Sequence, residues 1–191
     1  LSVRSFAEFE SGMLRVQAVT GATGSEFLAL TEQAKQLGAT TAFSAKQAAE
    51  GMGFLGQAGF NATEIQAAMG SVLNLAAAGA LELADAADIT ASVLRGFGMD
   101  ATEATKVTDV LAKAAASSNT SVQEMGEGFK FVGPVASAMG LSIEETAAAL
   151  SVLSDAGLKG SLAGTGLRQA LVKMGPDIIR SGGLLPALKA L

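Results

Sequence analysis

The sequence contains no cysteine, histidine, tryptophan or tyrosine. Without cysteine and histidine there are no disulfides, no thiol nucleophile, no soft-metal ligands and no side chain that ordinarily titrates near neutral pH. Catalysis would have to use carboxylates, lysines or hydroxyls with well-placed partners, and no such arrangement is recognisable. We therefore expect no enzyme, no cofactor and no metal site, while the compartment stays open.

Aromatic residues make up only 5% of the chain and basic residues are few, 13 against 18 acidic ones. The 49% of hydrophobic residues are mainly Ala, Leu, Val and Met, a composition typical of closely packed helices. A net charge of −5 with scattered basic residues speaks against stable nucleic-acid binding. Mean hydropathy is high at +0.40, but no window of about 18 apolar residues lacks a charge, so no membrane-spanning helix is predicted.

The length of 191 residues fits one ordinary domain. The chain begins at Leu1 without Met and ends on "LKAL", and we interpret it as a piece of a longer protein. The expected organisation is a leading helix at 1–20 continuing from the parent chain, a helical core region at 21–175, and a linker or the start of a following segment at 176–191.

The stretch "GFNATE" at 59–64 has near-copies in "GMDATE" at 98–103 and "GLSIEE" at 140–145. Each begins with Gly, suited to the left-handed residue that ends a helix, and continues with a strong N-cap residue and a Glu three positions later, the capping-box spacing. Weaker relatives are Ser44 with Gln47 and Ser121 with Glu124. The predicted capping residues are Gly59, Asn61, Glu64, Gly98, Asp100, Glu103, Gly140, Ser142 and Glu145.

Two of these stretches allow other interpretations. Asn61-Ala-Thr63 and Asn119-Thr120-Ser121 fit the glycosylation pattern, but capping or turn formation is the stronger interpretation because both asparagines stand at predicted helix starts. The strong copies are 39 and 42 residues apart, which also fits a two-helix repeat, although common helix punctuation explains them better. "GFGMDA" at 96–101 matches a dinucleotide pattern but follows no strand.

Apolar residues recur at helical spacing along the whole chain, and strand-like alternation is nearly absent. We predict an all-α fold without a sheet, a compact bundle or solenoid-like array of about eight or nine short helices separated by Gly-containing turns. The predicted helices lie near 3–20, 25–37, 45–57, 62–78, 82–96, 101–117, 121–139, 143–156 and 161–174. Pro134 should kink or break the helix at 121–139 near Val132.

Two sets of residues are candidates for helix packing or self-association. The first is a heptad-spaced seam that serves either as a core face or as a short coiled coil, formed by Val122, Met125, Phe129, Val132, Ala136 and Met139. The second is a small-residue face that suits very close helix contact, within this fold or with another copy, and includes Gly160, Gly164 and Ala170.

Composition and capping predict only an alanine-rich helical protein, but particular sequence segments are more specific. "LTEQAKQLGATTAFSAKQAAEGM", "LGQAGFNATEIQAAMGSVLNLAAAG" and the long stretch from "VTDVLAKAAASSNTSVQEMGEG" to "AGLKGSLAGTGLR" resemble, in this order, the core region of bacteriophage tail tape measure proteins, over about 20–174. The resemblance implies a structural virion protein of a long tail that acts in tail assembly and length determination inside the tube, contacts the tube and the tail-tip or distal tail proteins, and leaves at DNA ejection.

The short helices sharpen this expectation. A ruler needs extension, at about 1.5 Å per residue in a continuous helix, whereas this segment reverses repeatedly. We therefore expect a compact plug or anchor near the tail tip rather than the ruler itself, present as a homo-oligomer of three copies rather than six. It would reside in the lumen or tip of the virion tail after synthesis in the bacterial cytoplasm. The alternative is a membrane-active helical module that inserts into the host envelope during genome delivery.

Overall fold

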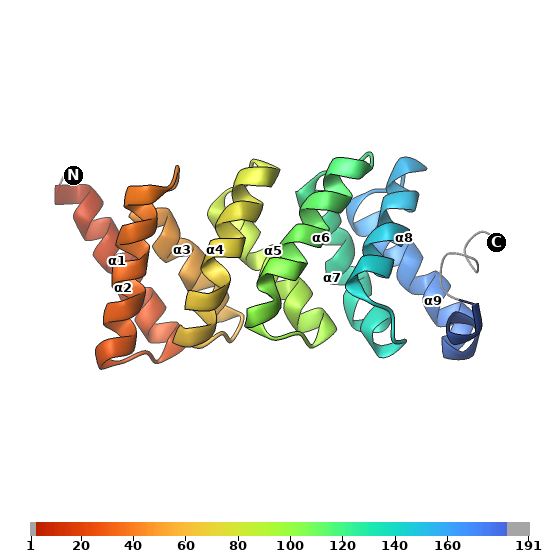
Figure 1. Ribbon diagram of the computed structural model, residues 1–191, viewed down its shortest axis with the longest axis horizontal. Coiled ribbons are helices and arrows are strands. Elements are labelled where there is room, and N and C mark those ends of the chain that lie inside the picture. The colour runs from red at the N-terminus through yellow and green to blue at the C-terminus, as the bar shows by residue number, and fades with distance from the viewer. Residues whose placement is uncertain (1–2, 183–191) are drawn as a thin grey trace. The chain divides into compact units, whose positions relative to one another are not determined.

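The computed structural model describes residues 3–182, and the side chains of residues 6–175. Within this range the chain consists of helices joined by turns and short loops and has no strand, which confirms the predicted all-α class (Figure 1). The elements in chain order are α1 (Val3–Thr20), α2 (Gly24–Thr40), α3 (Ala45–Gln57), α4 (Ala62–Gly79), α5 (Leu83–Phe97), η1 (Ala101–Glu103), α6 (Ala104–Ser117), α7 (Val122–Ala138), α8 (Ile143–Asp155) and α9 (Gly160–Gly182).

The described chain forms two compact units. Unit 1 runs to Ala91 and also includes residues 101–105, whereas unit 2 consists of residues 92–100 and the chain from Lys106 onwards. In unit 1, α3 packs against α1 and α2, and α4 packs against α2 and α3. In unit 2, the helices α7, α8 and α9 pack against one another, most extensively α7 against α9.

The apolar stripes expected from the sequence face the interior of each unit. In α4 the stripe consists of buried side chains one to two turns apart, namely Ile65, Met69, Val72, Leu73 and Ala76. In unit 2 the largest fully buried side chain is Phe129, whose ring forms a T-shaped pair with that of Phe97 at a centroid distance of 5.9 Å. The core is therefore built mainly from aliphatic residues, with one aromatic pair in unit 2.

Of the kink or break predicted at Pro134, the break is wrong, because α7 continues as one α-helix from Val122 to Ala138 with Pro134 inside it. A proline disfavours the helical conformation of the residue before it through clashes of its Cδ with that residue's backbone N–H and Cβ. The residue before Pro134 is Gly133, which has no Cβ, and the helix passes through the proline uninterrupted.

The last predicted helix also differs from the structure. Helix α9 extends to Gly182 and contains a non-helical residue, Gly175, with φ 73° and ψ 161°. The prediction of a helix at 161–174 therefore corresponds to the part of α9 before this interruption. Of the segment 176–191, expected to be a linker, residues 183–191 lie outside the described residues.

Candidate functional site

The turns at Gly59 and Gly140 end one helix and begin the next by the same arrangement. Both glycines are left-handed, with φ 88° and 80°. The amide of the following residue donates to a carbonyl five positions back, at 3.1 Å from Phe60 to Leu55 and 3.0 Å from Leu141 to Ala136. Phe60 and Leu141 are buried, so each turn is held by a hydrogen bond and an apolar contact.

The next helix then begins with a capping box. The backbone N–H of Glu64 donates to Asn61 Oδ1 at 3.0 Å, and the backbone N–H of Asn61 donates to Glu64 Oε2 at 2.7 Å. Ser142 and Glu145 form the same pair of bonds at 3.1 and 2.9 Å. These reciprocal bonds satisfy two amides that would otherwise lack a partner in the helix.

The middle copy, at Gly98, differs after the turn. Gly98 is left-handed with φ 64°, and the Met99 amide donates to the Leu94 carbonyl at 2.9 Å. The chain then forms the short 3-10 turn η1 at Ala101–Glu103, and α6 begins only at Ala104. The α-helix predicted to begin at 101, directly after Asp100, thus starts one turn later.

We expect Asn61→Ala to lower the free energy of unfolding by about 0.5–2 kcal/mol, because it removes the side-chain acceptor of a helix N-cap. Asn74 is exposed in the middle of the same helix, so Asn74→Ala makes the identical change where no cap exists and should be neutral or slightly stabilising. Urea unfolding followed by far-UV circular dichroism measures both. Equal effects of the two substitutions would contradict a capping contribution of Asn61.

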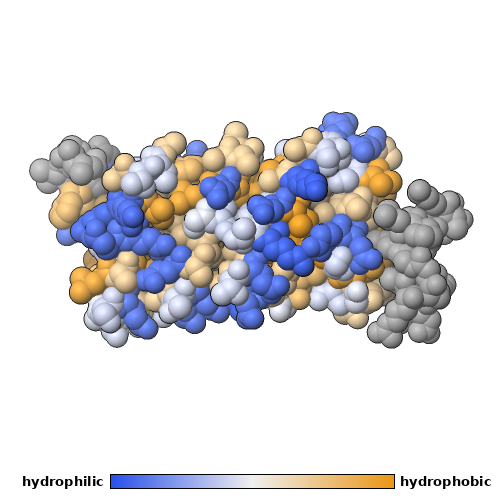
Figure 2. Space-filling model, in the orientation of Figure 1, coloured by the Kyte–Doolittle hydropathy of each residue, from blue (hydrophilic) through white to orange (hydrophobic). Residues whose placement is uncertain are grey.

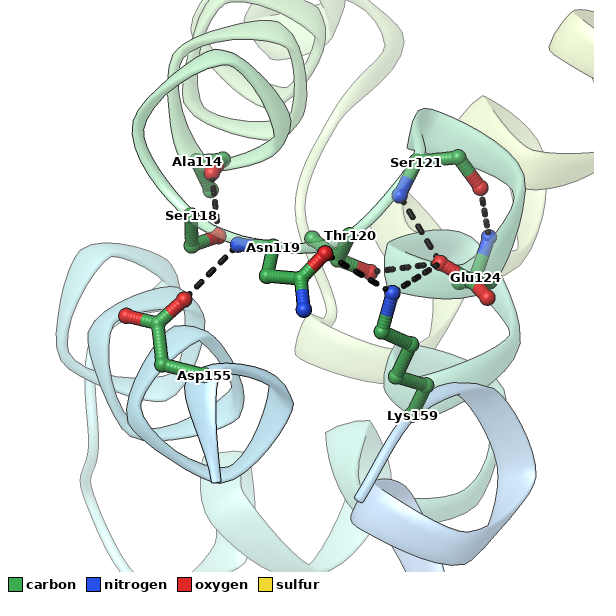
Figure 3. Close-up of polar contacts among 8 residues, drawn as sticks. All are labelled: Ala114, Ser118, Asn119, Thr120, Ser121, Glu124, Asp155 and Lys159. Carbon is green, nitrogen blue, oxygen red and sulfur yellow. Dashed lines mark hydrogen bonds and ion pairs between the residues drawn. The ribbon is translucent and has the colours of Figure 1, made fainter. Parts of the chain in front are cut away.

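A polar cluster joins the loop before α7 to the loop before α9 in unit 2 (Figure 3). The backbone N–H of Asn119 donates to Asp155 Oδ1 at 2.7 Å, and Lys159 Nζ donates to the side-chain oxygen of Asn119, Oδ1, at 3.1 Å. Lys159 also lies 4.0 Å from Glu124 Oε2. Asn119 thus lies in the loop before α7 and links it to Asp155 and Lys159. The N-cap of α7 is Ser121, not Asn119.

Glu124 is the charged centre of this cluster. Its Oε2 accepts from the Ser121 amide at 3.0 Å and from the Thr120 hydroxyl at 3.2 Å (Figure 3). The bond from the Ser121 amide, supported by Thr120 and the positive charge of Lys159, holds the pKa of Glu124 below its ordinary value despite partial desolvation. Ionised Glu124 is therefore the form that the folded state prefers.

This preference predicts a pH dependence of stability. Because the folded pKa lies below the unfolded value of 4.5, the stabilisation is present above that pH and is lost as the pH falls through the lower folded pKa. We expect Glu124→Gln to be less stable than the wild type at pH 7, and the difference to shrink at pH 3. Urea unfolding at both pH values measures this. A pH-independent difference would show that the charge contributes nothing.

The two sets of residues predicted to pack or self-associate lie mostly in the interior. Of the seam on α7, Val122, Met125, Phe129, Val132 and Ala136 are buried, and only Met139 is half-buried. Gly160 and Gly164 of α9 are also buried, whereas Ala170 is partly exposed. An added Cβ at Gly164 would overlap the Gly128 carbonyl of α7. In this fold the small residues of α9 allow the α7 and α9 backbones to approach closely.

Besides a more polar recess of about 390 Å³ between α1 and α3, the surface carries two mainly apolar grooves. One, of about 310 Å³, lies between α1 and α2 in unit 1. The other, of about 390 Å³, lies between α6 and α8 in unit 2, where Lys106 pairs with Glu144 at 3.2 Å. On the face drawn in Figure 2, hydrophobic residues are exposed between hydrophilic ones. Among the side chains that the structure describes, no group of three potential metal ligands occurs.

No single helix among the described residues has both the length and the apolar character needed to cross a membrane. Only α4 and α5 taken together meet these criteria, and the two helices are bent by 117° relative to each other.

Comparison with known proteins identifies the class of this helical chain. The model of the family described as phage-related minor tail protein matches residues 31–184, so the chain belongs to this family. More particularly, it is similar to tape measure proteins: it is 50% identical over 173 residues to the tape measure protein of Pneumococcus phage Dp-1 and 34% identical over 169 residues to the probable tape measure protein of Escherichia phage P2. The resemblance seen in the sequence is thereby confirmed.

These matches cover 91% and 87% of this chain but only 15% and 21% of the two relatives. The chain thus spans about a fifth or less of the length of the curated relatives it matches. No solved structure matches it.

Proposed function

We propose that this chain is a folded module of a phage tail tape measure protein, a structural component of the virion tail that acts in tail assembly and length determination. Two observations support the proposal: membership of the minor tail protein family, and the similarity of nearly the whole chain to two tape measure proteins from different phages. The apolar cores, capped turns and apolar surface grooves are typical of a structural protein that binds other proteins.

The repeated reversal of the chain is the observation that distinguishes this module from the part of the parent protein that measures tail length. Its longest uninterrupted helices among the described residues, α1 and α4, have 18 residues each, which is about 27 Å of helix at 1.5 Å per residue. As one continuous helix, the 191 residues would extend about 290 Å. Length measurement is therefore assigned to other parts of the parent protein, and this module acts as a plug or anchor near the tail tip inside the tube.

Contacts of this plug with other proteins belong to the same proposal. Several identical copies, three rather than six, surround the tube axis and contact the tube and tail-tip proteins until they are released at DNA ejection. Large apolar side chains exposed in both units, among them Leu14 at 60% and Leu162 at 68%, provide surface for such contacts. The net charge of −5 suits a protein that occupies the channel before DNA rather than binding it.

An in-frame deletion of this module in a phage that carries it tests the division of labour. We expect either no tails or tails of unchanged length, whereas a deletion of equal length elsewhere in the parent protein should shorten the tail by about 1.5 Å per residue. Electron microscopy of purified particles measures the length. Tails shortened by about 290 Å on deletion of the module would mean that it is part of the ruler.

A second candidate function is membrane insertion during genome delivery. The observation that favours it is the pair α4 and α5, which together have the length and apolar character of a membrane span. Against it, the apolar stripe of α4 is buried in unit 1, so insertion would require that unit to unfold. Leakage of dye from liposomes mixed with the purified chain tests this function, and absence of leakage from pH 5 to pH 8 at about micromolar protein would remove it.

A further inference from the structure

One side of α9 carries large apolar side chains that are mostly exposed. Leu162 and Val172 are exposed by 68% and 60%. About three helical turns separate them, so they lie on the same side of the helix, with the partly exposed Thr165 between them. The other side of α9, which includes Leu167 and Leu171, is buried in unit 2. Apolar side chains this exposed along one helix face indicate a surface that is covered by protein in the working state.

The interruption of α9 at Gly175 repeats the turns that end α3 and α7. At Gly59 and Gly140 a left-handed glycine is followed by an apolar residue and then by the N-cap of the next helix. Gly175 is left-handed with φ 73°, Pro176 and Asp177 follow it in the sequence, and the helical backbone then resumes. Proline has no N–H, so the amide bond that follows the other two glycines has no counterpart here. The chain nevertheless ends one helical stretch at Gly175 and begins another.

The turns at Gly59 and Gly140 fold the next helix back onto the preceding one. Helix α4 packs against α3 after Gly59, and α8 packs against α7 after Gly140. A reversal of the same kind at Gly175 returns the chain along α9. Leu188 is as far beyond Gly175 in the sequence as Leu162 is before it, so a helical return brings the two to the same level of α9.

Residues 183–191 have the sequence pattern of a short amphipathic helix and lie outside the described residues. Leu184, Leu188 and Leu191 recur at intervals of four and three positions, the spacing of one helix face. Pro186 stands near the beginning of this pattern, where a proline is tolerated because the first amides of a helix have no partner within it. Lys189, the one charged residue of the segment, falls on the opposite side. The segment therefore offers a leucine face of the kind that the exposed side of α9 requires.

We propose that residues 183–191 form an amphipathic helix that returns after Gly175 and covers the exposed side of α9, with Leu188 against Leu162. Because the segment belongs to the same chain, its effective concentration at α9 is high, and a small apolar contact is sufficient. The contact goes beyond the proposed function and does not depend on it. For that function it adds a condition: Leu162 becomes available to other tail proteins only when the segment leaves α9, so such a partner must compete with the segment.

Thiol labelling tests the contact, because the chain has no cysteine of its own. Thr165→Cys places one thiol on the exposed side of α9 and keeps Leu162 in place, and its reaction with a maleimide is followed by mass spectrometry of the 191-residue chain. We expect the additional substitution Leu188→Asp to speed this labelling by at least about tenfold, because a charge in the apolar contact releases the segment. Lys189→Asp introduces the same residue on the other side of the segment and should leave the rate unchanged.

Ala116→Cys provides the control for the fold. Ala116 is exposed on α6 in unit 2, so its labelling should be equally fast with the native segment and with Leu188→Asp. Labelling of Thr165→Cys that is equally fast with both segments would overturn the proposal. Protection of Thr165→Cys that grows with protein concentration would also overturn it, because the cover would then be a second copy.

A disulfide tests the same contact without a destabilising charge. In the double variant Leu162→Cys with Leu188→Cys, mild oxidation should form a disulfide within one chain, because the proposed pairing brings the two Cα atoms within bridging distance. Non-reducing electrophoresis and mass spectrometry distinguish it from a bridge between chains. Ala116→Cys with Leu188→Cys is the matched pair and should bridge at least about tenfold more slowly. Equal rates for the two pairs would contradict the return of the segment along α9.

Discussion

Replacement of Gly164 by alanine is expected to lower the free energy of unfolding by about 3 kcal/mol, near the upper end of the usual cost of overpacking. At the crossing of α7 and α9, an added Cβ at Gly164 would overlap the main-chain carbonyl of Gly128. A clash with a side chain can be relieved by rotation, but a clash with backbone requires the helices to separate. The separation would loosen the most extensive helix contact of unit 2.

Gly166 supplies the control for this prediction, two residues away in the same helix. No atom lies within 4 Å of the position its Cβ would take, and the residue is exposed. Gly166→Ala should therefore stabilise the helix by about 0.5–1 kcal/mol, the usual preference for alanine over glycine within a helix. Urea unfolding of both variants, followed by far-UV circular dichroism, measures the contrast. Two variants of equal stability would show that α7 and α9 do not cross in direct contact.

The helix boundaries at the turns of Gly59 and Gly140 could be predicted from the sequence because their causes are local. A glycine, an apolar residue and a cap such as Asn61, with Glu64 three positions later, lie within six residues of one another, and the bonds they form depend on little else. The same holds for Ser142 with Glu145. The all-α class follows from the number of such turns and from the apolar stripes between them.

The features that could not be predicted depend on residues far apart in the chain. Asn119 contacts Asp155 and Lys159, 36 and 40 positions later, and no local pattern distinguishes these polar residues from other exposed ones. Gly128 lies between Met125 and Phe129 of the α7 seam, and only the structure shows that it is the point at which Gly164 approaches. Sequence spacing shows that a face is apolar or small, but not which helix covers it.

Phe129→Ala is expected to be the most destabilising single substitution of a side chain in unit 2, at about 3–5 kcal/mol. Phe129 is 1% exposed, and its ring forms a T-shaped pair with that of Phe97, so truncation leaves a cavity and removes the aromatic contact. Phe131 lies two residues further along α7 and is 44% exposed. Phe131→Ala makes the same chemical change at the surface and should cost less than about 1 kcal/mol.

The Phe129→Ala variant also tests whether the two units unfold together. Phe129 belongs to unit 2, so a cooperative chain would show one calorimetric transition that moves to lower temperature as a whole in Phe129→Ala. Independent units would show a transition of unit 2 that moves while that of unit 1 stays in place. Because the chain lacks tryptophan and tyrosine, calorimetry and far-UV circular dichroism are the suitable probes. Unchanged melting of Phe129→Ala in every transition would contradict the buried position of this ring.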